Sequence, residues 1–269
     1  MIRCRKIART VTALSLAAVL SALACAAPAV SAGRAAEPQR RTKNKEKDPQ
    51  YQYELGKTAL GYGLTDEAIR YGELAVSLDP RLFDGWHLLG SAYYNKGEFA
   101  RSAEAYEKAL AIKPESAEVL DGLGLAYVEL KETAKAEAAF KKAYEIGGGY
   151  GTAYQLGKLC YGDGRYEEAL DYALKSIQKN GKNAGAYNLK GVVLNQLNRF
   201  AEAAGSFQAG LVLAPGDVNL QINLGIALYN SGEPSKARAV FEAVLPKVEQ
   251  DVLRKRIEDY IKAIKDAGK

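Results

Sequence analysis

The sequence contains little of the chemistry that catalysis or metal binding usually requires. Its 269 residues include one histidine, His87, and only three cysteines. A single imidazole excludes a histidine-rich metal site, and the chain has no phosphate-binding glycine loop, metal-ligand spacing or nucleophile motif. We therefore expect a protein that is not an enzyme and that needs no cofactor. What is present, 48% hydrophobic and 26% charged residues, is ordinary for a folded chain and excludes wholesale disorder.

Positive charge is concentrated at the start of the chain. Of the net charge of +5, residues 1–32 contribute +4 and residues 33–49 contribute +3, so the remaining 220 residues carry −2. A nearly neutral body lacks the basic runs that attract a nucleic-acid backbone. We therefore expect no nucleic-acid partner.

Residues 1–32 have the order of an export signal. Four basic residues precede the uncharged apolar stretch Val11–Ala26, and small residues follow up to Ala32. This order predicts a signal peptide that is cleaved before Gly33, and hence export to the periplasm. Two alternatives stay open: an uncleaved membrane anchor, or lipidation at Cys25, although the residues before Cys25 depart from the usual order. Attachment to the envelope membrane is expected only through such an anchor.

Two flexible segments are predicted. Residues 33–48 are basic and have no apolar periodicity, which is typical of a solvated linker. The segment Ile146–Gly151 contains four glycines where other parts of the chain have a proline boundary. Because glycine raises the backbone freedom of a chain, we expect a flexible joint there.

A repeat of about 34 residues organises the rest of the chain. A Leu-Gly pair or its equivalent recurs at steps of 34, 34, 33, 34 and 34 residues. The pairs are Leu55-Gly56, Leu89-Gly90, Leu123-Gly124, Leu156-Gly157, Lys190-Gly191 and Leu224-Gly225. A small residue follows each pair in phase, at Ala68, Ser102, Ala136, Ala169, Ala203 and Ala237. Markers that keep one phase six times indicate a repeat architecture.

This pattern resembles the tetratricopeptide repeat family over residues 49–249. The second unit carries the full family pattern, at Trp86, Leu89, Gly90, Tyr93, Ser102, Tyr106, Ala109 and Pro114. The fourth unit departs from it at Cys160, Ala173 and Gly181, and the fifth has Lys190 in the leucine position. The resemblance implies an all-α fold, a right-handed α-solenoid of about six helix-turn-helix repeats.

Each pair of helices is expected to meet at a residue with left-handed backbone geometry. Glycine, or asparagine in one unit, occupies this position at Gly63, Gly97, Gly164, Asn198 and Gly232. Lys131 is the exception, and we expect it to be strained or differently turned.

A final helix is predicted after the sixth unit. Residues 250–269 place Leu253, Ile257, Ile261 and Ile264 on one helical face. Terminal repeats need a cover for their apolar surface, so this pattern predicts a capping helix.

Two side-chain stripes are expected on the first helix of each unit. One stripe, such as Trp86, Leu89 and Tyr93, has the spacing of a core face, and Cys160 in this stripe is expected to be a buried, unreactive thiol. The other stripe begins one residue later, and the resemblance places it in the concave groove where family members bind peptides. With adjoining asparagines, it gives the candidate binding residues Tyr53, Lys57, His87, Tyr94, Asn95, Tyr154, Lys158, Tyr161, Asn188, Asn195, Asn223, Tyr229 and Asn230.

These candidates are mostly aromatic or amide side chains, which suit contact with a protein or peptide partner. The alternative interpretation is that the tyrosines fill gaps between adjacent first helices. One family variant clamps C-terminal carboxylates with lysines and asparagines, but only Lys57 and Lys158 lie in this stripe, so we expect no such clamp. The sequence thus predicts a non-enzymatic interaction module of the cell envelope. The alternative is a membrane-tethered lipoprotein resembling assembly factors of type IV pili or secretin pores.

Overall fold

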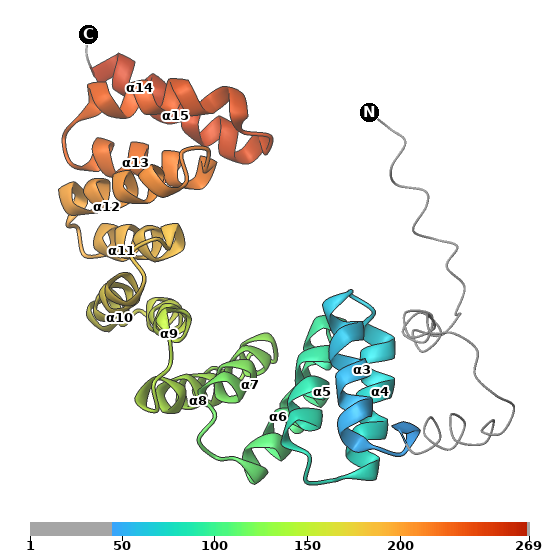
Figure 1. Cartoon of the computed structure of the whole chain (residues 1–269). Helices are drawn as coiled ribbons and strands as arrows, with labels where there is room; N and C mark the ends of the chain where they lie inside the picture. The colour runs from blue at the N-terminus through green and yellow to red at the C-terminus, as the bar shows by residue number, and fades with distance from the viewer. Residues whose placement is uncertain (1–44, 268–269) are drawn as a thin grey trace, which may run out of the picture. The chain divides into compact units, whose positions relative to one another are not determined.

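The computed structural model describes residues 45–267. They belong to two compact units, which divide between Ile112 and Lys113. Both units are built from α-helices, and the described part contains no strand (Figure 1). The predicted export signal, the lipidation candidate Cys25 and most of the predicted linker lie outside the described residues.

The first unit contains two helix pairs, and the second unit contains four pairs and a final helix. The first unit comprises α3 (Pro49–Gly61), α4 (Thr65–Leu78), α5 (Phe83–Lys96) and α6 (Phe99–Ile112). The second comprises α7 (Ala117–Glu129), α8 (Thr133–Glu145), α9 (Tyr150–Gly162), α10 (Tyr166–Lys179), α11 (Ala184–Gln196), α12 (Phe200–Leu213), α13 (Val218–Asn230), α14 (Pro234–Val244), the 3₁₀ turn η1 (Leu245–Lys247) and α15 (Asp251–Ala267). The odd-numbered helices α3 to α13 are called first helices below, and the even-numbered ones second helices.

Side-chain caps begin several of the first helices. The carboxylate of Asp48 accepts a hydrogen bond from the Gln50 backbone N–H at 2.9 Å, and Asp217 accepts one from Leu220 at 3.0 Å. Such caps satisfy backbone donors that have no partner inside the helix.

The turns inside the pairs have the predicted left-handed geometry. Gly63, Gly97, Gly164 and Gly232 have φ between 74° and 82°. Lys131 adopts the same turn with φ 61°, so its backbone is strained and not differently turned. A side chain in this conformation clashes with its own backbone, whereas glycine adopts it freely.

The glycine of the Leu-Gly marker admits an aromatic ring from the second helix of the same repeat. A Cβ atom placed on Gly90 would lie 2.5 Å from the Tyr106 ring, and one on Gly124 would lie 2.6 Å from Phe140. Gly191 and Gly225 face Phe207 and Phe241 in the same way. Any larger residue would therefore push the two helices of the pair apart.

The fourth repeat lacks this aromatic residue and is packed differently. Ala173 stands in its place, and a Cβ atom on Gly157 would instead lie 2.9 Å from Leu189, which comes from the next first helix. A leucine on α11 thus fills the space that a ring from α10 would occupy. This substitution explains how a degenerate repeat keeps its place in the array.

The leucines of the predicted core stripe are buried, whereas Trp86 is half-buried. Leu89, Leu123 and Leu156 are each less than 9% exposed, and Cys160 is fully enclosed beside Ala173 and Val193. Burial raises the pKa of the Cys160 thiol above its ordinary value. Since the thiolate is the reactive form, the structure supports an unreactive thiol.

The final helix packs onto the end of the second unit. Ile257 and Ile261 of α15 lie in one hydrophobic cluster with Leu228 of α13 and Phe241 of α14. Tyr260 of the same helix stacks on Phe241 with ring centroids 5.2 Å apart. Apolar surface at this end is therefore covered by α15.

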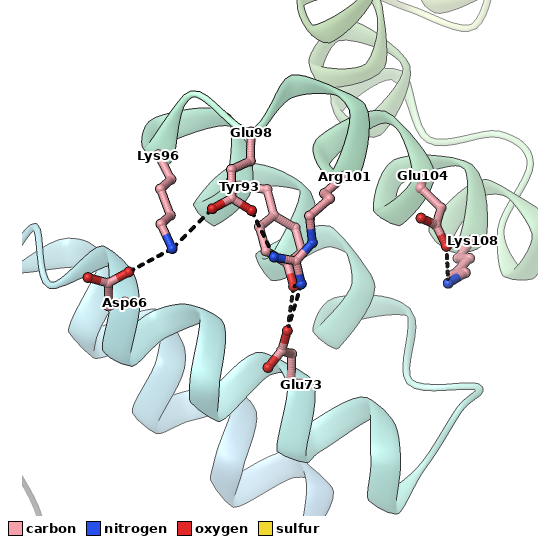
Figure 2. Close-up of polar contacts among 8 residues, drawn as sticks. All are labelled: Asp66, Glu73, Tyr93, Lys96, Glu98, Arg101, Glu104 and Lys108. Carbon is pink, nitrogen blue, oxygen red and sulfur yellow. Dashed lines mark hydrogen bonds and ion pairs between the residues drawn. The ribbon is translucent and has the colours of Figure 1, made fainter.

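A polar network links the two repeats of the first unit. The Tyr93 hydroxyl on α5 donates to Glu73 on α4 at 2.6 Å and accepts from Arg101 on α6 at 2.6 Å (Figure 2). Arg101 also pairs with Glu73 and Glu98, and Lys96 pairs with Glu98. Burial and the hydrogen bond to Glu73 raise the pKa of Tyr93, so its hydroxyl stays a donor at neutral pH. The network fixes the neighbouring helices in register.

Candidate peptide-binding surface

The predicted binding stripe forms one half-buried face in the second unit, called the inner face below. Most of its side chains are neither enclosed nor fully exposed, whereas Lys158, Tyr229 and Asn230 are exposed and Ile222 is buried. Its residues are Asp121, Leu125, Val128, Tyr154, Lys158, Tyr161, Asn188, Val192, Asn195, Ile222, Asn223, Ile226, Tyr229 and Asn230. A partly exposed row with few charges has the character of a contact surface.

A pair of amide side chains connects two first helices on this face. Asn223 of α13 donates a hydrogen bond from Nδ2 to Oδ1 of Asn188 on α11, over 3.0 Å. Both residues are half-buried, and the structure gives no hydrogen bond to the other amide atoms, Asn188 Nδ2 and Asn223 Oδ1.

Asn195 carries an unsatisfied polar atom on the same helix as Asn188. Its Oδ1 is enclosed and has no hydrogen-bond donor among the described residues. An unsatisfied buried acceptor costs about 1–3 kcal/mol of folding free energy. Asn195 is therefore a polar group whose burial opposes folding, and it lies on the predicted contact surface.

Asp121 is the inner-face carboxylate of α7. Its Oδ2 accepts a hydrogen bond from the Thr152 hydroxyl on α9 at 2.8 Å, but Oδ1 is enclosed and has no partner. Burial raises the pKa of Asp121, and the bond from Thr152 opposes that shift only in part. The pair connects the third and fourth repeats.

The tyrosines of the inner face also pack against neighbouring rings. The ring centroids of Tyr161 and Tyr166 lie 5.8 Å apart. The rings of Tyr229 and Tyr260 of α15 meet edge-on, with centroids 5.2 Å apart. Tyr154 and Tyr161 pack against the hydrophobic cluster that contains Cys160. These tyrosines therefore also take part in packing within the chain.

Lys158 is the inner-face cation of α9. Its Nζ lies 5.7 Å from the centroid of the Tyr154 ring, and it forms no ion pair among those that the structure gives. The neighbouring helices α11 and α13 contribute no charged residue to the inner face.

The five candidates of the first unit lie on α3 and α5. The Lys57 ammonium lies 5.8 Å from the Tyr53 ring centroid, and His87 lies between two aromatic rings at about 6 Å from each. Tyr94 packs edge-on against Phe99 at 5.4 Å, and Asn95 is exposed. His87 and Tyr94 therefore have packing contacts of their own.

A separate cleft of about 450 Å³ lies in the first unit, between α4 and α6. Trp86 and Tyr93 line the cleft. The indole N–H of Trp86 donates a hydrogen bond to the Pro80 carbonyl at 2.9 Å. The cations at its mouth pair with carboxylates of the chain itself, as Lys108 does with Glu104. This cleft therefore offers no free charge to a ligand.

Sequence reasoning missed the partners that arrange the inner face. Thr152, Tyr166, Gln196 and Tyr260 lie outside the predicted stripes, yet each contacts an inner-face side chain. No periodicity marks them, because their contacts depend on how neighbouring helices are offset in space.

Residues 45–267 lack two further features, a metal-binding cluster and a membrane-spanning helix. No group of histidine, cysteine, aspartate or glutamate residues there is arranged to hold a metal ion. No helix in that range has the length and apolar character needed to cross a membrane.

Family models for the tetratricopeptide repeat match residues 87–150, 154–218 and 194–255. The chain belongs to the tetratricopeptide repeat family. The match confirms the family that the 34-residue period predicts, and with the helix pairs it confirms the all-α solenoid class.

Curated relatives match this chain over a part of longer proteins. Human Protein O-mannosyl-transferase TMTC1 is 29% identical over 206 residues, which are 75% of this chain and 22% of that protein. Protein FlbA of Caulobacter vibrioides is 31% identical over 181 residues, 64% of this chain and 30% of that protein. The chain thus spans less than a third of the length of either relative.

Solved structures with the same fold match over most of their own length. PilF of Pseudomonas aeruginosa superposes with a TM-score of 0.69 at 17% identity, over 80% of this chain and 99% of that one. PilW, described as a type IV pilus biogenesis factor, superposes with a TM-score of 0.64 at 17% identity, over 80% of this chain and 97% of that one. YrrB, described as a TPR protein with an unusual peptide-binding site, superposes with a TM-score of 0.62 at 20% identity, over 70% of this chain and 97% of that one.

Proposed function

We propose that this protein is a non-enzymatic interaction module of the cell envelope, and that a peptide or protein segment binds to the inner face of its second unit. Tetratricopeptide repeat proteins bind protein or peptide partners, and this family membership supports the broad class of function. The proposal also specifies the binding surface as the inner face, since the equivalent positions line the concave groove in this family.

The amide pair Asn188–Asn223 is the observation that carries the proposal. Two repeats present these half-buried side chains together, and each keeps an amide atom to which the structure gives no hydrogen bond. Half-buried Val192 and Ile226 lie one turn further along the same two helices and add apolar contact area. Polar groups that converge beside apolar side chains are the usual composition of a binding surface.

A role in the envelope is supported by the residues before the described part. The order of charge, apolar stretch and small residues over residues 1–32 favours export. The matched length of PilF and PilW favours the second candidate, a membrane-tethered assembly factor lipidated at Cys25. The mass of the native N-terminus separates the two, since cleavage before Gly33 leaves no Cys25 to carry a lipid.

The absence of catalysis is part of the proposal. TMTC1 is named as a transferase, but the match covers 22% of that protein, so the named activity does not transfer with the repeats. The lone His87 lies between Phe83 and Tyr106, which fits a packing role better than that of a general base.

The test compares charge introduced on two surfaces. Asn223→Asp places a carboxylate in the amide pair, whereas Gln208→Glu places one on the exposed surface of α12. A partner purified from envelope extracts by crosslinking should lose affinity for the first variant and retain it for the second, with both variants equally helical by circular dichroism. Equal affinity for the two variants would show that the partner does not bind to the inner face of α11 and α13.

A further inference from the structure

We propose that Asn180 is a site of spontaneous covalent modification, at which the backbone nitrogen of Gly181 attacks the side-chain amide and the residue becomes a carboxylic acid. Asn180 lies in the turn between α10 and α11 and is not an inner-face residue. The inference is independent of the proposed function. It adds a reaction that the folded chain performs on itself.

The sequence around Asn180 favours this reaction. Asn180 is followed by glycine, and no other asparagine of the chain is. The attacking nitrogen belongs to the residue after the asparagine, and a side chain on that residue obstructs its approach. Glycine has no Cβ atom and leaves the backbone free to adopt the conformation that the attack needs. By sequence, Asn180 is therefore the asparagine best placed to react.

The fold leaves the Gly181 nitrogen available. Asn180 ends α10 in an extended conformation, with φ −149° and ψ 93°, and its own N–H donates to the Ser176 carbonyl. Gly181 is exposed, and its N–H donates none of the hydrogen bonds that the structure gives. Inside a helix this N–H would be bonded to the carbonyl four residues back. No hydrogen bond therefore has to break before the nitrogen can attack.

The side-chain amide of Asn180 is held in place by a backbone donor. Its Oδ1 accepts a hydrogen bond from the Lys182 N–H at 3.0 Å. This bond folds the side chain over the Gly181 peptide, which lies between the two bonded residues. The attack develops negative charge on Oδ1, and a donor about 3 Å from a developing oxyanion lowers the barrier. The turn thus both positions and activates the amide.

The reaction balances with water as its co-reactant. The Gly181 nitrogen loses its proton to solvent hydroxide and forms a bond to Cγ of Asn180. The bond from Cγ to Nδ2 breaks, and Nδ2 leaves as ammonia after taking a proton from water. Water then opens either C–N bond of the cyclic imide. The product is aspartate, or isoaspartate, whose main chain runs through the side-chain carbon and is longer by a methylene.

Asn230 provides a matched comparison within the same unit. It is followed by Ser231, whose small side chain also obstructs the attack little. Asn230 is the last residue of α13, however, and the Ser231 N–H donates to the Ala227 carbonyl at 2.9 Å. That bond occupies the nitrogen that would attack. The structure therefore predicts reaction at Asn180 and protection at Asn230.

Modification at Asn180 changes the link between the fourth and fifth repeats. A new carboxylate at the end of α10 lies at the negative end of the helix dipole, which disfavours it. The isoaspartate form also lengthens the connection to α11, whose Leu189 fills the space beside Gly157 of α9. Both changes should weaken the packing between these repeats.

The experiment incubates the full chain at mildly alkaline pH, either folded or in urea, and digests it with an endoprotease that cuts after glutamate. Mass spectrometry measures conversion at each asparagine, since the acid is heavier than the amide. Asn180→Gln removes the site, and Gly181→Ala is the matched variant. A Cβ atom on Gly181 would come no closer than 3.7 Å to the Ile177 carbonyl oxygen, and the φ of Gly181 is not positive, so alanine fits.

The inference predicts that Asn180 is converted at least as fast in the folded chain as in urea, and faster as the pH rises. Asn230 should be converted only in urea. Gly181→Ala should slow conversion at Asn180 on the order of tenfold, which corresponds to about 1.4 kcal/mol in the barrier. The converted wild-type chain should melt at a lower temperature than the fresh chain, whereas incubated Asn180→Gln should melt as before.

Three results would overturn the inference. Conversion of Asn180 in urea but not in the folded chain would show that the turn protects the amide. Equal conversion of Asn180 and Asn230 in the folded chain would show that the free Gly181 nitrogen does not decide the site. An unchanged melting temperature after full conversion would overturn the predicted weakening between the repeats. None of these results bears on binding at the inner face, so the proposed function is tested separately.

Discussion

Replacing Lys131 by glycine should stabilise the second unit. Lys131 has φ 61°, a left-handed conformation that glycine provides at four equivalent positions with φ between 74° and 82°. The left-handed conformation costs a residue with a side chain about 1–2 kcal/mol, and the greater flexibility of unfolded glycine offsets about 0.5–1 kcal/mol of the gain. We expect Lys131→Gly to raise the free energy of unfolding by about 0.5–1 kcal/mol.

Urea denaturation followed by far-UV circular dichroism measures this change. Lys131→Ala is the matched control, because it removes the same charge but keeps the strained conformation, and it should give no gain. Asn198→Gly should gain less than Lys131→Gly, since asparagine tolerates the left-handed region better than lysine. If the alanine variant were as stable as the glycine variant, backbone strain at Lys131 would not be the cause.

Three further predictions concern the second unit. Asp121→Asn should stabilise the protein at neutral pH relative to wild type. Because burial raises the pKa of Asp121 in the folded state, this advantage should shrink as the pH falls through the carboxyl titration range. Thermal melting at several pH values tests this prediction. Asn195→Leu should raise the melting temperature while weakening partner binding, since it removes an enclosed, unsatisfied oxygen. Lys179→Met should speed hydrogen exchange and proteolysis around Gly148, whose carbonyl accepts from Lys179 at 2.5 Å, while Lys182→Met should not.

The helical architecture is predictable from the sequence because its signals are local and repeated. Leu-Gly markers in phase fix the helix pairs, and the left-handed turn positions are read directly from the glycines. The strain at Lys131 was one of two expected outcomes, since the sequence cannot show whether a turn changes its geometry to suit a poor residue.

The packing of the degenerate fourth repeat is not predictable in the same way. Its missing ring is visible in the sequence as Ala173, but the leucine that replaces it, Leu189, comes from the next first helix. Compensation of this kind depends on the offset between neighbouring repeats, which the period of one sequence does not specify.

The glycine segment between α8 and α9 shows a related limit. Composition alone predicts a flexible joint, yet Lys179 donates to the Gly148 carbonyl and Ser176 donates to the Tyr150 carbonyl at 2.9 Å. Both donors come from α10, about thirty residues away in the sequence. Flexibility of this joint stays a prediction, and the Lys179→Met variant measures how far the two bonds restrain it.

The candidate site is predictable as a row but not as a set of contacts. The 34-residue period places Ile222 at the position equivalent to Asn188, and Asn223 is the next residue, so both amides are expected on or beside one face. Their hydrogen bond, and the packing of Tyr161 on Tyr166, depend on side-chain reach between elements. The sequence therefore predicts the row, while the hydrogen bond between its two amides became visible only in the structure.

Site-specific photocrosslinking tests the central claim most directly. A benzophenone amino acid is placed at Val192 on the inner face or at Val212, which is 80% exposed on α12, and the cells are irradiated. The account predicts a discrete crosslinked partner from position 192 and none from position 212, and Asn223→Asp should abolish the adduct at 192. The same partner crosslinked from 212 and not from 192 would contradict it, because the contact surface would then lie on the second helices.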